Sequence, residues 1–172
     1  MVNIHIATSI PKSSNRRQAG EYIYVLEAET EKGIYTKDSA GFEPDTTKNR
    51  LTLIALNEAL GRLKAGEDAR IYTENTYVRH PIEEGWIYRW KADGFQRSQV
   101  KAGKKYFIRL ENADLWEKLF HTLQEYQITW ADEPGSYHSW MKEELKRRRK
   151  EIQIEYYKGY THAGGINEKT SE

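Results

Sequence analysis

The side chains of this 172-residue chain that are best suited to chemistry are basic, and they are concentrated locally. The net charge is only +1, so the protein as a whole has little electrostatic attraction for nucleic acid. From Tyr88 to Arg109, however, seven basic residues stand against one acid, Asp93, and residues 146–150 are continuously basic. Such a basic loop is usually a solvated surface, and a basic block such as 146–150 is most often a helix end complemented by its dipole. A phosphate-binding surface is the functional alternative. The seven residues are Arg89, Lys91, Arg97, Lys101, Lys104, Lys105 and Arg109.

Other reactive or metal-binding groups are sparse. With no cysteine, the chain has neither a disulfide framework nor a thiolate metal site, which suits a reducing cytoplasm. We expect no signal peptide and no membrane span, because no basic segment precedes a long apolar run. The five histidines show no shared ligand spacing, so we expect no histidine metal site; they are His5, His80, His121, His138 and His162.

The N-terminal third predicts three strands. Apolar residues alternate over Val2–Thr8, which indicates a strand buried on one face. Residues 21–30 are rich in β-prone side chains and predict a second strand. After a turn at 31–33, residues 34–38 predict a short third strand, antiparallel to the second.

The rest of the chain alternates between helices and strands. A threonine at Thr46-Thr47 is the predicted cap of a helix that runs to about Lys64, with Gly66 as its stop. The order predicts a mixed sheet flanked by helices, with one domain over 1–155 and a flexible tail over 156–172. The later predicted elements are a strand at 69–73, a helical region at 75–93 broken near Pro81, the basic loop, a helix at 113–126, a strand at 127–131 and a helix from about 136 into the 150s.

Four short segments, taken together, resemble one enzyme family. Residues 46–53 (TTKNRLTL), 72–78 (YTENTYV), 84–91 (EGWIYRWK) and 112–116 (NADLW) occur in this order. They resemble the TTNNRMEL-like, TDSQYV, W-x-x-x-W-K and N-x-D-L-W segments of the type 1 ribonuclease H family. The likeness covers about residues 2–148, and it implies that family's α/β fold, a five-stranded mixed sheet flanked by helices.

The resemblance also implies a chemistry, because this family cleaves the RNA strand of RNA–DNA hybrids with two Mg²⁺ ions held by an Asp-Glu-Asp-Asp set. Two such ions, about 4 Å apart, need several carboxylates to offset their repulsion. In this sequence the four matching positions are Ala7, Thr52, Glu74 and, in a looser match at the opening of the last helix, Glu143. We therefore expect no catalytic residue, no metal ligand and no cofactor, with Glu74 and Glu143 as the two remaining candidate ligands.

Groups that hold the hybrid in this family are better retained. Asn49 and Asn75 match residues that contact 2′-hydroxyls in the minor groove. The arginine of a DNA-phosphate pocket corresponds to Asp45, which has the opposite charge. The resemblance implies a nucleic-acid-binding set of Thr47, Asn49, Asn75, Trp86, Trp90, Lys91, Lys101, Lys104, Lys105 and Asn112. Trp86 and Trp90 are equally suited to anchoring a helix in the core.

Three hypotheses follow. The first is a nuclease-like domain that binds a duplex, either an RNA–DNA hybrid or double-stranded RNA, without cleaving it. The second is a protein-binding scaffold, whose aromatic surface would be Trp86, Trp90, Phe95, Tyr106 and Phe107. The third is an active hydrolase that uses Mg²⁺ in a rearranged site, built on Glu74, Glu143 and either Asp132 or Asp38.

Overall fold

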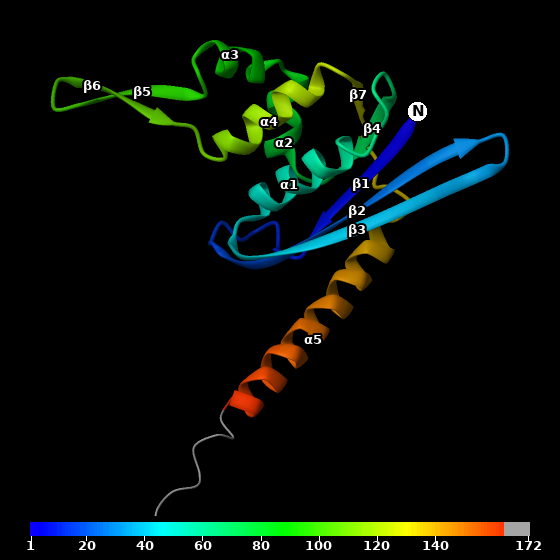
Figure 1. Ribbon diagram of the computed structural model, residues 1–172. Coiled ribbons are helices and arrows are strands. Elements are labelled where there is room, and N and C mark those ends of the chain that lie inside the picture. Colours follow the sequence, from blue (N-terminus) through cyan, green and yellow to red (C-terminus); the bar gives the residue numbers. More distant parts are fainter. Residues whose placement is uncertain (164–172) are drawn as a thin grey trace, which may run out of the picture.

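The computed structural model describes residues 1–163, in which seven strands and five helices follow the predicted alternation (Figure 1). In chain order they are β1 (Val2–Thr8), β2 (Gln18–Thr30), β3 (Gly33–Thr46), α1 (Lys48–Leu60), β4 (Asp68–Tyr72), α2 (Thr76–Glu83), α3 (Trp86–Ala92), β5 (Gln96–Lys101), β6 (Lys104–Arg109), α4 (Ala113–Leu123), β7 (Gln127–Trp130) and α5 (His138–Ala163).

Five strands form one mixed sheet in the order β3-β2-β1-β4-β7. β1 and β3 run antiparallel to β2, whereas β4 runs parallel to both β1 and β7. The parallel pairs place the carboxyl ends of β1 and β4 at the same edge of the sheet. The predicted five-stranded mixed sheet is therefore confirmed.

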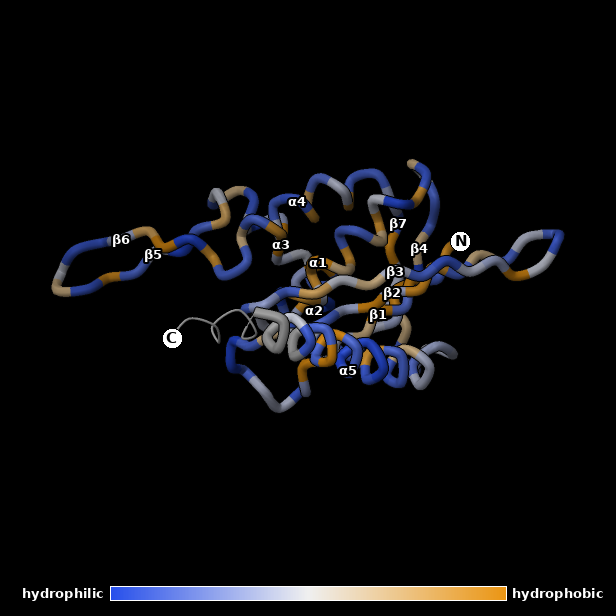
Figure 2. Tube along the Cα trace, turned by 60° about the horizontal axis from the view of Figure 1, so that its bottom comes forward, coloured by the Kyte–Doolittle hydropathy of each residue, from blue (hydrophilic) through white to orange (hydrophobic). Residues whose placement is uncertain are grey.

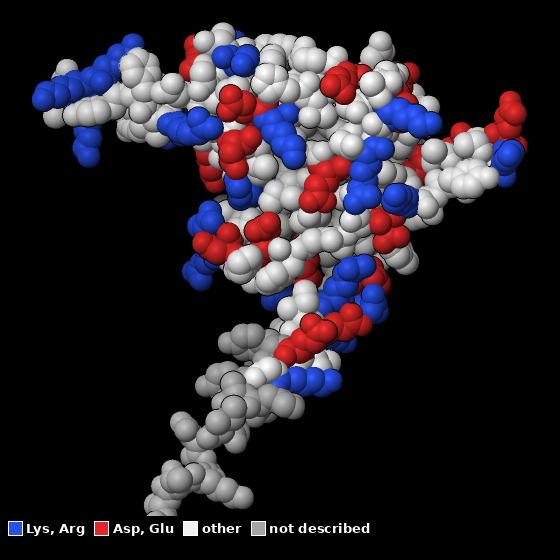
Figure 3. All heavy atoms as spheres, viewed as in Figure 1, with Lys and Arg blue, Asp and Glu red and all other residues white. Residues whose placement is uncertain are grey.

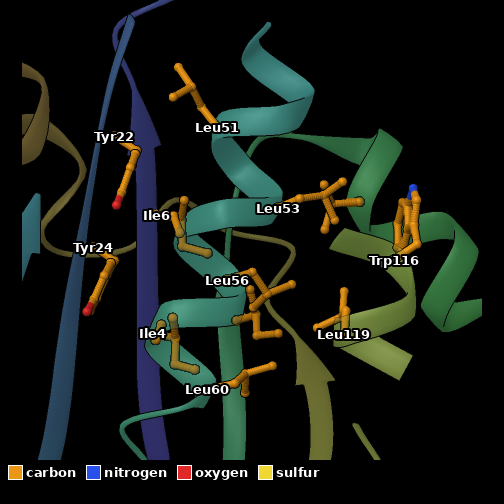
Figure 4. Close-up of a cluster of buried hydrophobic side chains, with 14 of the residues drawn as sticks. Ile4, Ile6, Tyr22, Tyr24, Leu51, Leu53, Leu56, Leu60, Trp116 and Leu119 are labelled. Carbon is orange, nitrogen blue, oxygen red and sulfur yellow. The ribbon is translucent and has the colours of Figure 1, made fainter. Parts of the chain in front are cut away.

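Helices cover both faces of this sheet (Figures 1 and 2). On one face, leucines of α1 fill the space between β1 and α4, where they meet Trp116 and Leu119 (Figure 4). On the other face, Met141 and Leu145 of α5 pack on Ala7, Ile23 and Val25. Burial of each large apolar side chain contributes roughly 1.5–3 kcal/mol, so the two clusters hold α1 and α5 firmly across the same strands.

This double cover corrects the prediction of a half-buried first strand. His5 is 1% exposed and Ala7 6%, while Ile4 and Ile6 are buried on the opposite face. Because a helix packs on each side of the sheet, both faces of the central strand are buried. The alternation of polar and apolar residues in β1 therefore did not mark one face as exposed to solvent. The third strand is also longer than predicted, because β3 is an edge strand whose outer half is exposed and has no apolar pattern.

The basic segment is a hairpin and not the predicted loop. β5 and β6 pair as a separate two-stranded ribbon that projects from the body (Figure 1). Its turn residues Ala102 and Gly103 both have positive φ, 52° and 76°, as a type I′ hairpin turn requires. The ribbon therefore presents its charges well away from the main sheet.

Several predicted helix boundaries also shift. α1 ends at Leu60, before the predicted Lys64, and Gly66 instead donates from its backbone to Glu125. Pro81 lies inside α2, and the break falls at Gly85, whose φ of 73° favours glycine. α5 continues to Ala163, past the predicted boundary at residue 155, and the last part of the predicted tail lies outside the described residues.

Candidate functional site

The ends of β1, α1, β4 and α5 surround a pocket of about 210 Å³. Ala7 comes from β1, Thr52 from the second turn of α1, and Glu74 from the loop directly after β4. All three line this pocket, so the structure brings together three of the four positions that the sequence resemblance singles out.

Most charged side chains at the pocket are cationic. Among the described residues that line it, Glu74 is the one acid, beside Lys12, Lys48 and Lys142. The Lys12 ammonium lies 3.3 Å from the Glu74 carboxylate, and His138 Nε2 lies 3.9 Å from the same oxygen. Three lysines against one glutamate give these four side chains a formal charge of +2.

The other two lysines are oriented by neutral partners. Lys142 Nζ donates to the Thr8 carbonyl at 3.3 Å, and the Lys48 ammonium donates to the Lys12 carbonyl. A carbonyl dipole can orient an ammonium group without cancelling its charge. These two positive charges therefore remain directed towards the pocket.

A hydrogen-bond network on α1 and α2 involves Thr52 and Asn75. Thr52, which is 2% exposed, donates to the Lys48 carbonyl at 2.8 Å and accepts from Asn75 Nδ2 at 3.1 Å. The same amide nitrogen donates to Asn49 Oδ1 at 3.0 Å, and Asn75 Oδ1 caps α2 by accepting from the Tyr77 backbone at 3.1 Å. The two asparagines predicted to contact nucleic acid thus lie together, beside the pocket, and bind each other.

The start of α5 brings other residues than Glu143 to the pocket. Glu143 is not one of the described residues that line it; it is exposed and pairs with Lys146 at 3.0 Å. The residue that opens the last helix is His138, and Lys142 follows one turn later on the same face. The expected match of Glu143 failed because the loop before α5 contains no motif to fix the alignment.

The acids of the rearranged-site hypothesis are dispersed. Asp132 pairs with Arg79 at 2.8 Å and lines a neighbouring pocket that shares Glu74 with the first. Asp38 lies on β3 opposite Val25 and lines neither pocket. Within residues 1–163, no three His, Cys, Asp or Glu side chains gather as a metal-binding group.

The predicted phosphate-pocket residues Thr47 and Asn112 both contact Arg50. Thr47 is the N-cap of α1 and accepts from the Arg50 backbone, as predicted, at 3.2 Å. The Arg50 guanidinium donates to Asn112 Oδ1 at 3.3 Å and to both carboxylate oxygens of Asp114 at 3.0 and 2.8 Å. This contact lowers the pKa of the Asp114 carboxyl.

Asp45, at the position where the sequence resemblance implies an arginine, has a cationic partner of its own. Arg17 Nε lies 3.1 Å from the Asp45 carboxylate, and the same guanidinium donates to its carbonyl at 2.9 Å. The negative charge at this position is therefore largely balanced within the chain.

The two tryptophans have different environments. Trp90 packs edge-to-face on buried Trp116, with ring centroids 5.1 Å apart, so it anchors α3 to the core. Trp86 is 38% exposed. Lys91 lies above the Phe120 ring at 5.7 Å, and Phe95 is 2% exposed. Phe95 is thus a core residue and not part of the predicted aromatic surface.

The β5–β6 hairpin carries the remaining predicted lysines. Lys101 and Lys104 face each other beside its turn, and Lys105 lies above the Phe107 ring at 5.4 Å. Every residue of both strands is exposed, and Lys and Arg side chains gather along the projecting ribbon (Figure 3). Tyr106 and Phe107 are exposed beside them.

Sequence reasoning missed the lysines of the pocket. Lys12 lies in a polar loop without a motif, and Lys142 is recognisable only once the start of α5 is known. Lys48 did leave a signal, because it replaces the first asparagine of the TTNNRMEL-like segment. This change of charge within a matched segment could have indicated the pocket.

Comparisons with known proteins identify the family. The RNase H family profile matches residues 11–135, well over half of the chain. Ribonuclease H of Cupriavidus necator is 40% identical over 98 residues, 57% of this chain and 62% of that protein. Ribonuclease H of Chlorobium phaeobacteroides is 33% identical over 103 residues, 60% of this chain and 66% of that protein. The chain belongs to the RNase H family, and the match spans less than two thirds of these relatives' length.

Solved structures show the same fold. LC9-RNase H1, a type 1 RNase H with the type 2 active-site motif, superposes with a TM-score of 0.62 at 20% identity, covering 85% of this chain and 68% of that one. The foamy viral protease-reverse transcriptase in complex with an RNA/DNA hybrid gives 0.58 at 17% identity, covering 84% of this chain and 19% of that one. None of the helices described is both long and apolar enough to cross a membrane.

Proposed function

We propose that this chain is a nucleic-acid-binding member of the RNase H family that binds an RNA–DNA hybrid or another duplex without two-metal cleavage. One observation carries the proposal. Where Ala7, Thr52 and Glu74 converge, the pocket holds a single carboxylate and three lysines.

This donor set does not fit a pair of divalent cations. Mg²⁺ binds through oxygen ligands, usually carboxylates, and two neighbouring ions require several negative charges. Ala7 has no side-chain oxygen, Thr52 offers a hydroxyl already engaged in two hydrogen bonds, and Glu74 is paired with Lys12. A formal charge of +2 would repel both ions.

Binding is supported by what the fold retains. The lysine-rich hairpin offers charges and exposed aromatic rings to a phosphate backbone, a combination common in nucleic-acid-binding proteins. The solved relative in complex with an RNA/DNA hybrid has the same fold. Hybrid and double-stranded RNA share an A-like shape, so we expect both to bind more tightly than duplex DNA.

The test combines cleavage and binding on the same preparation. Labelled hybrid is incubated with the protein in Mg²⁺ and in Mn²⁺, and affinities are measured for hybrid, double-stranded RNA and duplex DNA of equal length. We expect intact RNA and salt-sensitive binding. Degradation of the RNA strand that stops in Glu74→Gln would refute the loss of cleavage, and absence of binding to all three duplexes would refute the binding function.

The exposed apolar side chains of the hairpin favour a second candidate, the protein-binding scaffold. Val100 is 71% exposed and Phe107 66%, which is unusual for large apolar side chains in a folded domain. If a protein partner binds this surface, the Val100→Ser/Phe107→Ser variant should no longer bind it. A partner that this variant still binds must contact another surface.

A cytoplasmic location stays a prediction.

A further inference from the structure

Three helices begin at the pocket that contains Glu74. The first residues of α1, α2 and α5, namely Lys48, Thr76 and His138, all line it. Each helix N-terminus carries a partial positive charge from its aligned peptide dipoles. These dipoles add to the charge of the three lysines, so backbone and side chains favour the same kind of ligand.

The lysines are arranged to keep this charge available. Lys48 and Lys142 donate to backbone carbonyls, which are neutral, and Lys12 alone has an anionic partner. The pocket volume of about 210 Å³ exceeds the roughly 30 Å³ that one water occupies in the liquid. A tetrahedral phosphate group, still partly hydrated, fits in this space.

We infer that the pocket binds a backbone phosphate of a nucleic-acid strand directly through the ammonium groups of Lys12, Lys48 and Lys142. The lysines take the place that cations occupy in a metal-dependent site, and binding needs no divalent ion. The inference rests on the proposed function for the source of the phosphate, but the chemistry of the pocket stands on its own geometry.

The Glu74 carboxylate has opposite effects on phosphate binding in a metal-dependent site and in this lysine-lined pocket. As a metal ligand, its carboxylate would be needed to hold the cation that contacts the phosphate. Here it lies 3.3 Å from Lys12 and competes with the phosphate for that ammonium group. Neutralising Glu74 therefore strengthens phosphate binding in this pocket, whereas it weakens binding in any site that depends on a metal ion.

The experiment measures duplex affinity by fluorescence anisotropy, in EDTA, over a series of salt concentrations. Lys142→Gln should weaken binding about tenfold and reduce the salt slope by about 0.7–0.9, the contribution of one phosphate contact. Glu74→Gln should strengthen it about threefold, as expected for removal of a competing, partly exposed ion pair. Lys64→Gln is the matched control, an exposed lysine beyond the opposite end of α1, and should change nothing.

Several outcomes separate this inference from the proposed function. If duplexes bind but Lys142→Gln and Lys48→Gln both match the unmodified protein, the pocket inference is wrong and the proposed function stands on the hairpin. Weaker binding by Glu74→Gln, with a normal melting temperature, would also overturn it. A parallel titration with inorganic phosphate is followed by NMR of the pocket amides. If inorganic phosphate shifts the amide signals and Lys142→Gln abolishes these shifts, while no duplex binds, the pocket is an anion site. In that case its phosphate does not come from a nucleic acid, and the proposed function is wrong.

Discussion

Asn75 connects the candidate site to the stability of the fold, and two substitutions at this position separate its roles. Its side-chain oxygen caps α2 through the Tyr77 backbone, while its nitrogen donates to Asn49 and Thr52. Asn75→Ala removes all three hydrogen bonds. Asn75→Asp keeps an oxygen for the cap and adds a negative charge that the helix N-terminus favours. It loses the donated bonds, and its second oxygen faces Asn49 and Thr52, whose amide and hydroxyl groups must turn to donate to it.

The magnitudes follow from these contacts. Loss of the cap costs about 1 kcal/mol, and the two donated bonds together contribute about 1–2 kcal/mol, so Asn75→Ala should destabilise the fold by about 2–3 kcal/mol. Asn75→Asp should cost about 1 kcal/mol less. For a chain of this size, the alanine variant should melt roughly 4–12 °C lower.

Urea denaturation followed by tryptophan fluorescence measures the stability of both Asn75 variants, because the transition midpoint reports stability when the m-value is unchanged. The serine variant of neighbouring Thr76, an N-terminal helix residue with an exposed side chain, is a suitable control. Equal loss in both Asn75 variants, or a larger loss in Asn75→Asp, would refute the assignment of the cap.

Three further predictions concern burial, close packing and charge. Burial of His5 lowers the pKa of its imidazole below the usual 6.5, against a smaller opposing effect of Glu27. The unfolded chain therefore binds a proton that the folded chain does not. Stability should fall as pH drops below about 6.5, by up to roughly 1.4 kcal/mol per pH unit, and His5→Phe should flatten that part of the urea-measured profile. Gly135→Ala should lower stability by about 1–3 kcal/mol, because its Cβ would overlap Nδ1 of the buried His5 ring. At Gly159, an added Cβ would meet no atom within 4 Å, so Gly159→Ala should not lower the stability measured in the same urea assay. Replacing Lys101, Lys104 and Lys105 together by glutamine should reduce the salt slope of duplex binding by about 2–3, and an unchanged slope would exclude the hairpin from the interface.

The sequence predicted the main architecture because strand and helix periods are properties of local segments. Apart from the β5–β6 hairpin, the order of the elements is confirmed, and so is a threonine cap for α1. Exposure was harder to predict, since it depends on distant parts of the chain. His5 is buried only because Tyr72, Tyr137 and Gly135 close over it, and none of these is near it in sequence.

Within the site, the sequence predicted best those residues that belong to recognisable segments. Thr52, Asn75 and Glu74 line one pocket, and their segments could be matched in the sequence because motifs fix their position on α1 and after β4. The pocket lysines lie in the N-terminal loop, at the first position of a helix and one turn into another. No short-range pattern connects these places, and only the folded sheet brings them together.

Geometry and charge can vary independently in this pocket because different parts of the chain determine them. The backbone positions of Ala7, Thr52 and Glu74 follow from two packed clusters, one on each face of β1, whose side chains are apolar. Lysine side chains can reach the pocket from its rim, with their stems along apolar surface and their ammonium groups in water, so changes of these rim residues leave the two clusters intact. The apolar clusters therefore set the shape of the pocket, while the rim side chains set its charge. On the proposed function, the positive charge around Glu74 suits a phosphate that ammonium groups hold directly, without a divalent cation between them.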